Sequence, residues 1–264
     1  EMKIQGKTVV VTGAGSGMGR QLVLELVARG AKVAAVDMRE ETLEETKALA
    51  RGEVATFVVD ITDSNAVAAL PSQVAGALGE ADVLINNAGI IQPFVKVNEL
   101  SMEAANRVMN VNFNGPLMLI KAFLPGFLTR PEAHILNVSS MGAYAPVPGQ
   151  SVYGASKAAI KLLTEGLRSE LLNTKVGVTV VFPGAIATNI AQNSGLEIPA
   201  DAAENSKQKT TPADVAAKAM IDAIESGKPR ITIGSDATLM DRLSRLNPVF
   251  AANLIYKQMA NLLG

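Results

Sequence analysis

The sequence predicts an α/β fold in which a single domain holds a doubly wound parallel sheet of about seven strands, with helices on both faces. Short apolar segments rich in β-branched residues alternate strictly with amphipathic helical segments, which is the pattern of a sheet covered on both sides. A glycine-rich turn joins the first strand to the first helix. The 264 residues, 48% of them hydrophobic and without an internal repeat, suffice for one buried core.

The predicted strands are short and apolar, as suits strands that are buried on both faces. They cover residues 7–12, 31–37, 54–60, 81–86, 133–139, 175–182 and 230–234. The helical segments between them cover residues 17–29, 41–50, 64–78, 101–128, 151–173 and 212–226. Right-handed crossovers place ligands at the carboxyl edge of such a sheet. The residues that follow directly on strands are therefore expected along one edge: Gly13, Asp37, Asp60, Asn87, Ser140 and Pro183.

The first strand ends in a turn that suits a pyrophosphate. Three valines at 9–11 precede the glycines, and an amphipathic helix follows. A strand, a glycine turn and a helix N-terminus leave backbone N–H groups free for an anion. Gly13 permits the tight turn, Gly17 lets the backbone approach the phosphates, and Gly19 allows the helix to pack closely on the strand.

An acidic residue, Asp37, ends the second strand, eighteen residues after Gly19. A carboxylate at this place accepts hydrogen bonds from both hydroxyls of an adenosine ribose and repels a 2′-phosphate. Arg39 lies two residues further on and could bind a 2′-phosphate. The pattern therefore favours NAD as cofactor and leaves NADP open.

Tyr153 and Lys157 stand four residues apart on a predicted helix and so share one face of it. A unit charge at roughly 4 Å and an effective dielectric near 20 is worth about 4 kcal/mol. Such a charge lowers the pKa of a phenol by up to about three units. A tyrosinate near neutrality takes a proton from an alcohol or returns one to a ketone.

In these segments the chain resembles the short-chain dehydrogenase/reductase family, from about residue 5 to about residue 190. The sequence Thr-Gly-Ala-Gly-Ser-Gly-Met-Gly at 12–19 is similar to the glycine turn of that family, and Asn-Asn-Ala-Gly at 86–89 to its segment after the fourth strand. The resemblance implies a Rossmann-like fold, a bound nicotinamide cofactor and a catalytic set. That set is Asn112, Ser140, Tyr153 and Lys157.

The resemblance also implies a role for each of these residues. Tyr153 would be the general acid and base, while Lys157 would lower its pKa and hold the nicotinamide ribose. Ser140 would donate a hydrogen bond to the substrate oxygen. Asn112 would hold a water that links Lys157 to solvent. Ser139 is the rival for the role of Ser140, but neighbouring side chains at a strand end point in opposite directions, and the spacing to Tyr153 favours Ser140.

The expected cofactor-binding residues come from the glycine turn, the strand ends, the catalytic pair and the loop after the sixth strand. They are Gly13, Ser16, Gly17, Met18, Gly19, Asp37, Asp60, Ile61, Asn87, Ala88, Gly89, Tyr153, Lys157, Pro183, Gly184, Ile186 and Thr188. The expected wall of the substrate pocket is Ile91, Gln92, Phe94, Met141, Gln150, Ala185 and Ile190. Because this set is mostly apolar, we expect a neutral, moderately hydrophobic secondary alcohol or ketone as substrate.

Two other functions stay open at this stage. One is a non-catalytic regulator that binds NAD on the same fold, although such a protein would be expected to lack Ser140, Tyr153 or Lys157. The other is a nicotinamide-dependent epimerase or dehydratase. Those relatives usually carry a larger C-terminal substrate domain than 264 residues allow.

Two segments depart from regular alternation. Residues 189–211 are polar and rich in small residues, and we expect them to form a lid over the substrate. Residues 238–264 are expected as a helical extension that is atypical of the family, with its apolar residues in core packing or subunit contacts. These apolar residues are Leu239, Leu243, Leu246, Phe250, Leu254 and Ile255. A membrane-surface helix is the less favoured alternative. The resemblance implies a homotetramer or homodimer built on the helices at 101–128 and 151–173.

The composition excludes several other functions. A formal net charge of −1 and the lack of a basic run argue against nucleic acid as a partner. No apolar span is long enough to predict an integral membrane segment, and no secretory leader is evident. The chain has no cysteine, which fits the cytoplasm and excludes a cysteine nucleophile. Its single histidine, His134, starts a strand and is expected to be structural, so no metal site is predicted.

Overall fold

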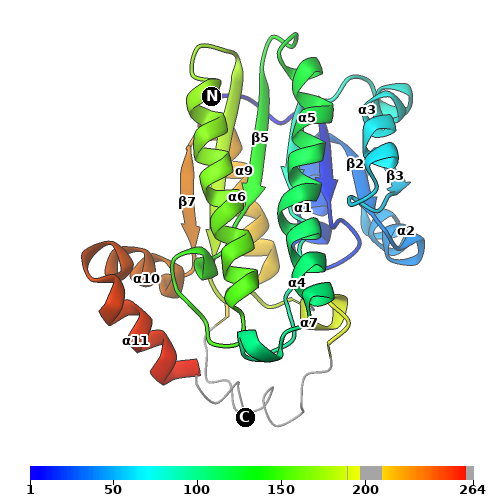
Figure 1. The fold of residues 1–264 in the computed structure, drawn as a ribbon. Coiled ribbons are helices and arrows are strands. Elements are labelled where there is room, and N and C mark those ends of the chain that lie inside the picture. Colours follow the sequence, from blue (N-terminus) through cyan, green and yellow to red (C-terminus); the bar gives the residue numbers. More distant parts are fainter. Residues whose placement is uncertain (189, 197–209, 260–264) are drawn as a thin grey trace.

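The computed structural model describes residues 1–188, 190–196 and 210–259, and its strands form one parallel sheet in the order β3-β2-β1-β4-β5-β6-β7 (Figure 1). The strands are β1 Thr8–Thr12, β2 Lys32–Asp37, β3 Val54–Val58, β4 Val83–Asn86, β5 Ala133–Val138, β6 Val176–Pro183 and β7 Arg230–Ile233. The predicted doubly wound fold is confirmed. The order reverses between β1 and β4, which is where ligands bind in sheets of this kind.

Helices connect the strands and cover both faces of the sheet. The α-helices are α1 Gly17–Ala28, α2 Glu40–Leu49, α3 Ser64–Leu78, α4 Met102–Met109, α5 Gly115–Phe127, α6 Ser151–Glu170, α7 Ile190–Asn193, α9 Ala213–Ser226, α10 Ser235–Leu246 and α11 Pro248–Met259. The short 3₁₀ segments are η1 Val97–Glu99 and η3 Met141–Ala143. None of the helices in the described ranges is long and apolar enough to cross a membrane.

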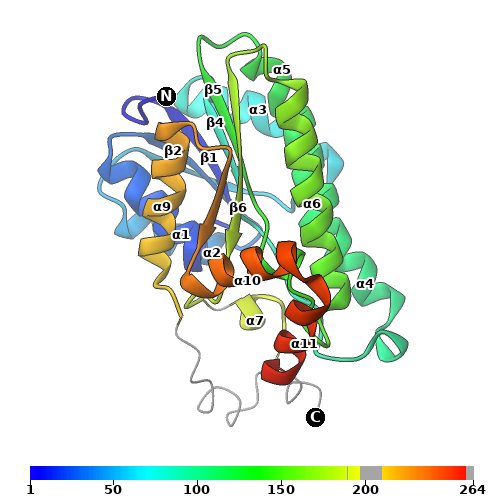
Figure 2. The same cartoon turned by 90° about the vertical axis from the view of Figure 1, so that its left-hand side faces the viewer.

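Two apolar layers sandwich the sheet, with α1 and α9 on one face and α3, α5 and α6 on the other (Figure 2). Successive residues of a strand point to opposite faces. Thus Val9 and Val11 pack in the α1 layer, while Val10 packs in the α5 layer. The valine run of β1 is therefore buried throughout because both faces are covered.

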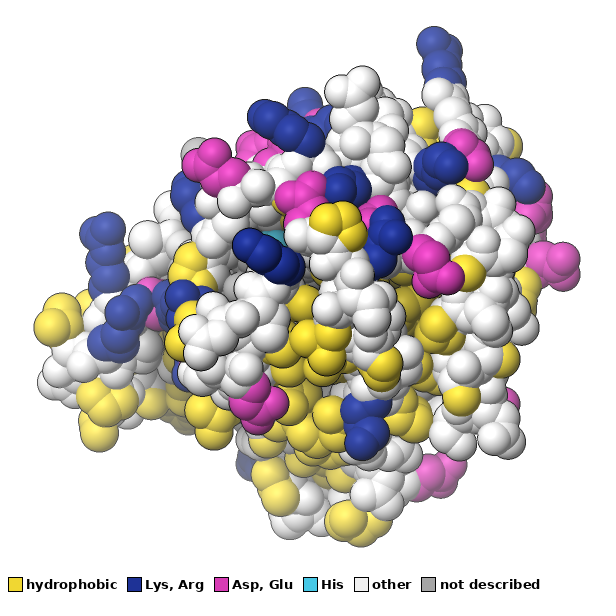
Figure 3. All heavy atoms as spheres, turned by 90° about the horizontal axis from the view of Figure 1, so that it is seen from above, with side chains coloured by type: hydrophobic (Ala, Val, Ile, Leu, Met, Phe, Trp, Pro, Cys, Tyr) yellow, Lys and Arg dark blue, Asp and Glu magenta, His cyan; other side chains and the backbone are white. Residues whose placement is uncertain are grey.

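The end of the molecule near the N-terminus, at the amino ends of the strands, carries a mixed surface. Figure 3 views this end and shows Lys and Arg side chains interspersed with Asp and Glu side chains. Such a surface fits a net charge of −1. The residues predicted to bind ligands lie at the opposite, carboxyl end of the strands.

The predicted single helix at 101–128 is wrong in one respect. The chain stays helical, but a π-helical segment, η2, occupies Asn110–Asn114 between α4 and α5. A π turn adds a residue to the turn and is frequent at functional sites. Here it carries Asn112, whose side chain is buried. Helical periodicity in a sequence does not reveal such a local change of hydrogen-bond register.

The C-terminal segment forms α10 and α11, which lie beside the carboxyl end of β7 (Figure 1). They pack on η3 through a small apolar cluster that includes Met141, Met240 and Ile255. Within the chain, only some of the apolar residues of this segment are covered, so subunit contact stays a prediction for the others. Leu246 is 84% exposed, and Leu239 and Phe250 are about half exposed.

The predicted lid at 189–211 lies mostly outside the described residues, because residue 189 and residues 197–209 are not among them. Of this segment, residues 190–196, 210 and 211 are described; they include α7, and Thr211 forms a parallel bridge with Ile186.

His134 lies inside the sheet and away from the predicted site. Its Nε2 lies 2.7 Å from the Thr179 hydroxyl, whose own hydrogen is donated to the Lys228 carbonyl. Nε2 therefore carries the proton and donates it to Thr179. Nδ1 faces Gly177, and a Cβ atom added to Gly177 would lie only 2.4 Å from Nδ1. The ring is thus held neutral, and burial lowers the pKa of His134 to about 4.

This burial predicts a pH-dependent loss of stability. In the unfolded chain, His134 binds a proton below about pH 6.5. In the folded chain, it binds a proton only when the pH falls to about 4. His134 therefore stabilises the fold fully above pH 6.5, and that stabilisation is lost as the pH falls to about 4. The loss amounts to roughly 3 kcal/mol. Urea unfolding from pH 7 to pH 4 measures it, with His134→Gln as the control that lacks the titration. Equal pH dependence of the two proteins would contradict this account.

Candidate active site

The turn between β1 and α1 is closely packed against the segment after β4. Gly13 has φ +66°, and a Cβ atom on Gly19 would lie 1.8 Å from the Gly13 carbonyl oxygen. Ser16 precedes α1 without a side-chain capping bond, and the first turn holds no acidic side chain. The N–H groups at the start of α1 are therefore available to an anion.

Asn87 joins this turn to the end of β4. Its Nδ2 donates to the Thr12 carbonyl at 3.1 Å, and the backbone N–H groups of Asn87 and Ala88 donate to the Thr12 hydroxyl. Its Oδ1 is buried and has no partner in the described part of the chain. A buried acceptor without a donor is costly unless a ligand supplies one. A ribose hydroxyl of a dinucleotide fits this requirement.

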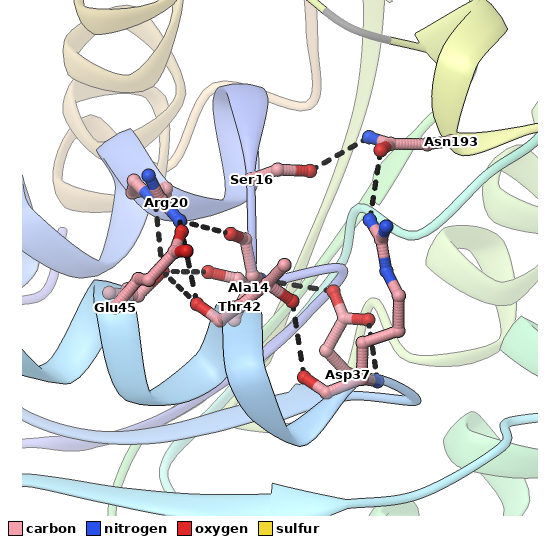
Figure 4. Close-up of polar contacts among 10 residues, drawn as sticks. Ala14, Ser16, Arg20, Asp37, Thr42, Glu45 and Asn193 are labelled. Carbon is pink, nitrogen blue, oxygen red and sulfur yellow. Dashed lines mark hydrogen bonds and ion pairs between the residues drawn. The ribbon is translucent and has the colours of Figure 1, made fainter.

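At the end of β2, the Asp37 carboxylate points into the same groove (Figure 4). One oxygen accepts from the Gly15 N–H at 3.0 Å and the other from the Arg39 N–H at 3.3 Å. A carboxylate offers about four acceptor sites, so room remains for hydroxyl donors. The Arg39 guanidinium turns to α7 and donates to the Asn193 Oδ1 at 2.9 Å. Asn193 in turn donates to the Ser16 hydroxyl at 2.8 Å (Figure 4).

Ser140 and Tyr153 meet at the carboxyl end of β5. The Ser140 hydroxyl accepts from the Gly142 N–H at 3.0 Å, and a Cβ atom on Gly142 would lie 3.3 Å from the Tyr153 ring. Ser139 points the other way, because its buried hydroxyl donates to the Lys157 carbonyl at 2.7 Å. The geometry thus places Ser140, and not Ser139, beside the phenol.

Lys157 is buried one turn further along α6. Its Nζ donates to the Val138 carbonyl at 3.1 Å and lies 5.9 Å from the centre of the Tyr153 ring. Burial lowers the pKa of Lys157 to about 8. Burial also raises the pKa of Tyr153, while the Ser140 hydroxyl acts in the opposite direction. The drop in the Tyr153 pKa expected from its spacing to Lys157 is therefore not found in this structure, because spacing alone leaves out desolvation.

Asn112 connects the π segment to the loop after β4 and to α6. Its Nδ2 donates to the Ile90 carbonyl and to the Ser156 hydroxyl, and its Oδ1 accepts from the Ile90 N–H. Ser156 then donates to the Tyr153 carbonyl at 2.6 Å. Asn112 thus fixes the turn of α6 that carries the phenol. Its oxygen and the Lys157 ammonium both approach Gly89.

Two adjoining cavities contain most of the predicted site residues. The larger, of about 630 Å³, holds residues of the glycine turn and the ends of β2, β3 and β4: Gly13, Ser16, Gly17, Met18, Asp37, Asp60, Ile61, Asn87, Ala88, Gly89 and Thr188. The smaller, of about 390 Å³, holds the predicted catalytic side chains, the end of β6 and the loop after it: Ser140, Tyr153, Lys157, Pro183, Gly184 and Ile186. Gly19 and Asn112 line neither cavity. These two residues lie in the protein interior behind the cavities.

The substrate wall differs from the prediction at Gln92. The other predicted wall residues line the smaller cavity: Ile91, Phe94, Met141, Gln150, Ala185 and Ile190. Gln92 is fully buried, and its side chain accepts from N–H groups at the start of α6. The structure adds Val147 and Met259 to the wall. Met259 comes from α11, and no sequence signal tied that helix to the site.

The described part of the chain has no group of three or more His, Asp or Glu side chains that could hold a metal ion.

A family model described as short chain dehydrogenase matches residues 7–198. The chain belongs to the short-chain dehydrogenase family. The relatives that it matches are named as oxidoreductases and short-chain dehydrogenases. The chain is 34% identical over 259 residues to a protein of Mycobacterium tuberculosis, SadH, which is named only as an oxidoreductase. That match covers 92% of this chain and 91% of SadH.

Solved structures of short-chain dehydrogenases have the same fold. One from Burkholderia phymatum, in complex with NAD, has a TM-score of 0.83 at 28% identity and covers 94% of this chain and 98% of its own. One from Burkholderia cenocepacia, in complex with NADP, has a TM-score of 0.82 at 30% identity and covers 96% of this chain and 99% of its own. The family thus accommodates either nicotinamide cofactor.

Proposed function

We propose that this short-chain dehydrogenase transfers a hydride between NAD(H) and a neutral, moderately hydrophobic secondary alcohol or ketone. The observation that supports this most is the convergence of Ser140, Tyr153 and Lys157 in an apolar cavity that adjoins the dinucleotide groove. The nicotinamide, when bound, supplies or accepts the hydride. The protein manages the accompanying proton and the charge on the substrate oxygen.

Each polar group of the smaller cavity then has a task. Tyr153 takes the hydroxyl proton in oxidation and returns it in reduction. Ser140 donates a hydrogen bond to the substrate oxygen, where negative charge develops in the transition state. The Lys157 ammonium favours the ionised phenol and holds ribose hydroxyls of the cofactor. Asn112 keeps the turn of α6 in place and, as in the family pattern, would hold a water beside Lys157.

A preference for NAD is supported by Asp37 and by the position of Arg39. The Asp37 carboxylate, directed into the groove, would repel a 2′-phosphate and accept ribose hydroxyls. Arg39 is the cation best placed to offset that repulsion, but its guanidinium is bonded to Asn193. That bond holds the guanidinium toward α7, so a 2′-phosphate would have to bind its remaining N–H groups or displace Asn193.

The lining of the smaller cavity supports the substrate class. Apart from Tyr153 and Lys157, its described residues carry no ionisable side chain. Three methionines line it: Met18, Met141 and Met259. Methionine is flexible and polarisable, and it adapts to apolar groups of varied shape. Among the described lining residues, Lys157 is the one cation that an acidic or phosphorylated substrate would meet.

A screen tests the proposal directly. Purified protein is assayed at 340 nm with NAD plus secondary alcohols, and with NADH plus ketones, of graded size and charge. We expect turnover of neutral apolar members and little turnover of their carboxylated analogues. Cofactor binding with no turnover across the panel would favour the non-catalytic regulator instead.

We predict that α11 contributes to substrate affinity. Met259→Ala removes apolar contact from the cavity wall but leaves the reacting groups in place. A loss of about 1 kcal/mol raises KM roughly fivefold with kcat unchanged. Kinetics on the best apolar substrate of the screen measure this. Leu246→Ala, on the exposed end of α10, is the control and should leave KM as it is. An unchanged KM for Met259→Ala would mean that α11 does not contact the substrate.

We also propose assembly through the helices that the family resemblance indicates. Large apolar side chains are exposed on α4, on α6 and just after α5, among them Met102, Leu128 and Leu162. Association of copies through these helices would cover them. Light scattering of the purified protein distinguishes a homodimer from a homotetramer.

A further inference from the structure

The Gln92 side chain caps the N-terminus of α6, the helix that carries Tyr153, although Gln92 is not the residue at the N-cap position. Its Oε1 accepts from the backbone N–H groups of Val152 and Tyr153 at 2.8 and 2.9 Å. These are the second and third residues of α6, whose N–H groups a side chain at the N-cap position normally satisfies. The acceptor thus comes from a segment 61 residues away from Tyr153 in the sequence.

The residue that stands at the N-cap position itself, Gln150, does not cap the helix with its side chain. Its amide instead exchanges two hydrogen bonds with the backbone of Gln92, donating to the carbonyl at 2.7 Å and accepting from the N–H at 3.2 Å. The two glutamines therefore hold each other. Since both are buried, the position of the Gln92 amide beneath the first turn of α6 is fixed.

This arrangement leaves one costly defect. The Nε2 of Gln92 is buried and has no acceptor among the described residues. The amide cannot be reversed, because Nε2 would then face two N–H donors. A glutamate would accept the same two bonds, and the helix N-terminus would favour its charge. It would also place an ionised carboxylate in a fully buried site, with its second oxygen where the Nε2 now lies. The protein thus departs from the rule that buried donors are paired, and it does so with a neutral side chain. Local rules of this kind are broken mainly at functional sites.

We propose that Gln92 is a positioning residue for Tyr153 that caps the catalytic helix without adding negative charge, so that the phenol can give up its proton during turnover. This inference rests on the acid–base role of Tyr153 in the proposed function. A carboxylate beneath the first turn would cancel the positive end of the α6 dipole and would repel a tyrosinate.

Few charged groups surround the Tyr153 phenol, so one added negative charge would have a large effect on its ionisation. The elements around the phenol are the start of α1, the end of β5, η3, α6, α7, the end of α11 and the loops after β4, η3 and β6. Among the described residues that these elements contribute to the cavity, the ionisable ones are Tyr153 and Lys157. Asp236 lies behind the loop after β6, where it accepts from the Ala185 N–H. A glutamate at position 92 would be the first carboxylate at the base of Tyr153.

The test compares Gln92→Glu with Gln92→Leu and with Gln73→Glu, which makes the same change on the exposed face of α3. For Gln92→Glu, urea unfolding checks that the variant still folds cooperatively. The alkaline-rising limb of kcat/KM for alcohol oxidation should move up by about one pH unit, so that oxidation below the limb falls about tenfold. Ketone reduction at neutral pH should stay within about twofold, because the phenol is already protonated there.

The two controls separate charge from structure. Gln92→Leu loses the cap, so it should unfold at lower urea concentration and lose kcat in both directions with the limb unmoved. Gln73→Glu should match the unmodified protein in every readout. An unmoved limb in Gln92→Glu, or an equal loss in both directions, would overturn the proposal. If Tyr153→Phe also retains its turnover, the acid–base role itself fails. If Tyr153→Phe is inactive, only the inference about Gln92 fails.

Discussion

Replacing Tyr153 by phenylalanine is expected to reduce turnover by roughly 10²–10⁴-fold, the usual contribution of general acid–base catalysis. The change keeps the ring that packs against Gly142 and removes only the hydroxyl. Folding and cofactor affinity should therefore stay close to those of the unmodified protein. Single-turnover kinetics of hydride transfer and a separate titration of cofactor binding measure the two effects independently.

Tyr256→Phe is the matched control, because Tyr256 lies exposed on α11 and should tolerate the same change without loss. Retention of more than about a tenth of the turnover by Tyr153→Phe, with the chemical step rate-limiting, would show that another group moves the proton. The pH dependence of turnover should reflect the ionisation of Tyr153. Because burial raises the pKa of Tyr153, oxidation by the protein should be favoured by alkaline pH.

The unmodified protein is expected to prefer NAD over NADP by at least about a hundredfold in kcat/KM. Exchanging NAD for NADP replaces two charge-assisted hydrogen bonds to Asp37, worth roughly 1.5–3 kcal/mol each, by repulsion of a phosphate dianion. Asp37→Ala should erode the preference mainly by weakening NAD. Removing the Arg39 partner as well, in Asp37→Ala with Asn193→Ala, should release the guanidinium and let NADP gain.

The comparison uses one substrate and both cofactors, with Asp214→Ala as a control that removes an exposed carboxylate at the start of α9. A gain for NADP that persists when Arg39 is also replaced by alanine would assign the effect to Asp37 alone. Equal kcat/KM values for the two cofactors in the unmodified protein, or a preference for NADP, would mean that Arg39 governs the groove despite its bond to Asn193.

Most of the fold follows from local patterns. Runs such as Val9–Val11 are apolar throughout because both faces of a parallel sheet are covered, and this pattern survives in the sequence as an unbroken apolar stretch. Gly13 and Gly17 have positive φ, and a Cβ atom on Gly19 would overlap the Gly13 carbonyl, so glycines mark the turn in the sequence. The strand ends therefore locate the proposed cofactor groove from the sequence alone.

The details of the site depend on contacts between distant segments. Nothing in the sequence near Gln92 shows that its amide reaches α6, and nothing near Met259 shows that α11 ends at the substrate cavity. The π segment around Asn112 is equally invisible, because it keeps the helical composition and changes only the hydrogen-bond register. These three features arise from the packing of segments that are distant in the sequence.

The sequence by itself determined the parallel α/β architecture, the family, and the residue types at the two cavities. Each of these depends on the spacing of residues within a single strand, turn or helix, which can be read without knowing the tertiary structure. Only the tertiary structure decided the balance of charge and burial at Tyr153 and the bond that ties Arg39 to Asn193. Desolvation and hydrogen bonding depend on every neighbour in space, and most of those neighbours are remote in the chain.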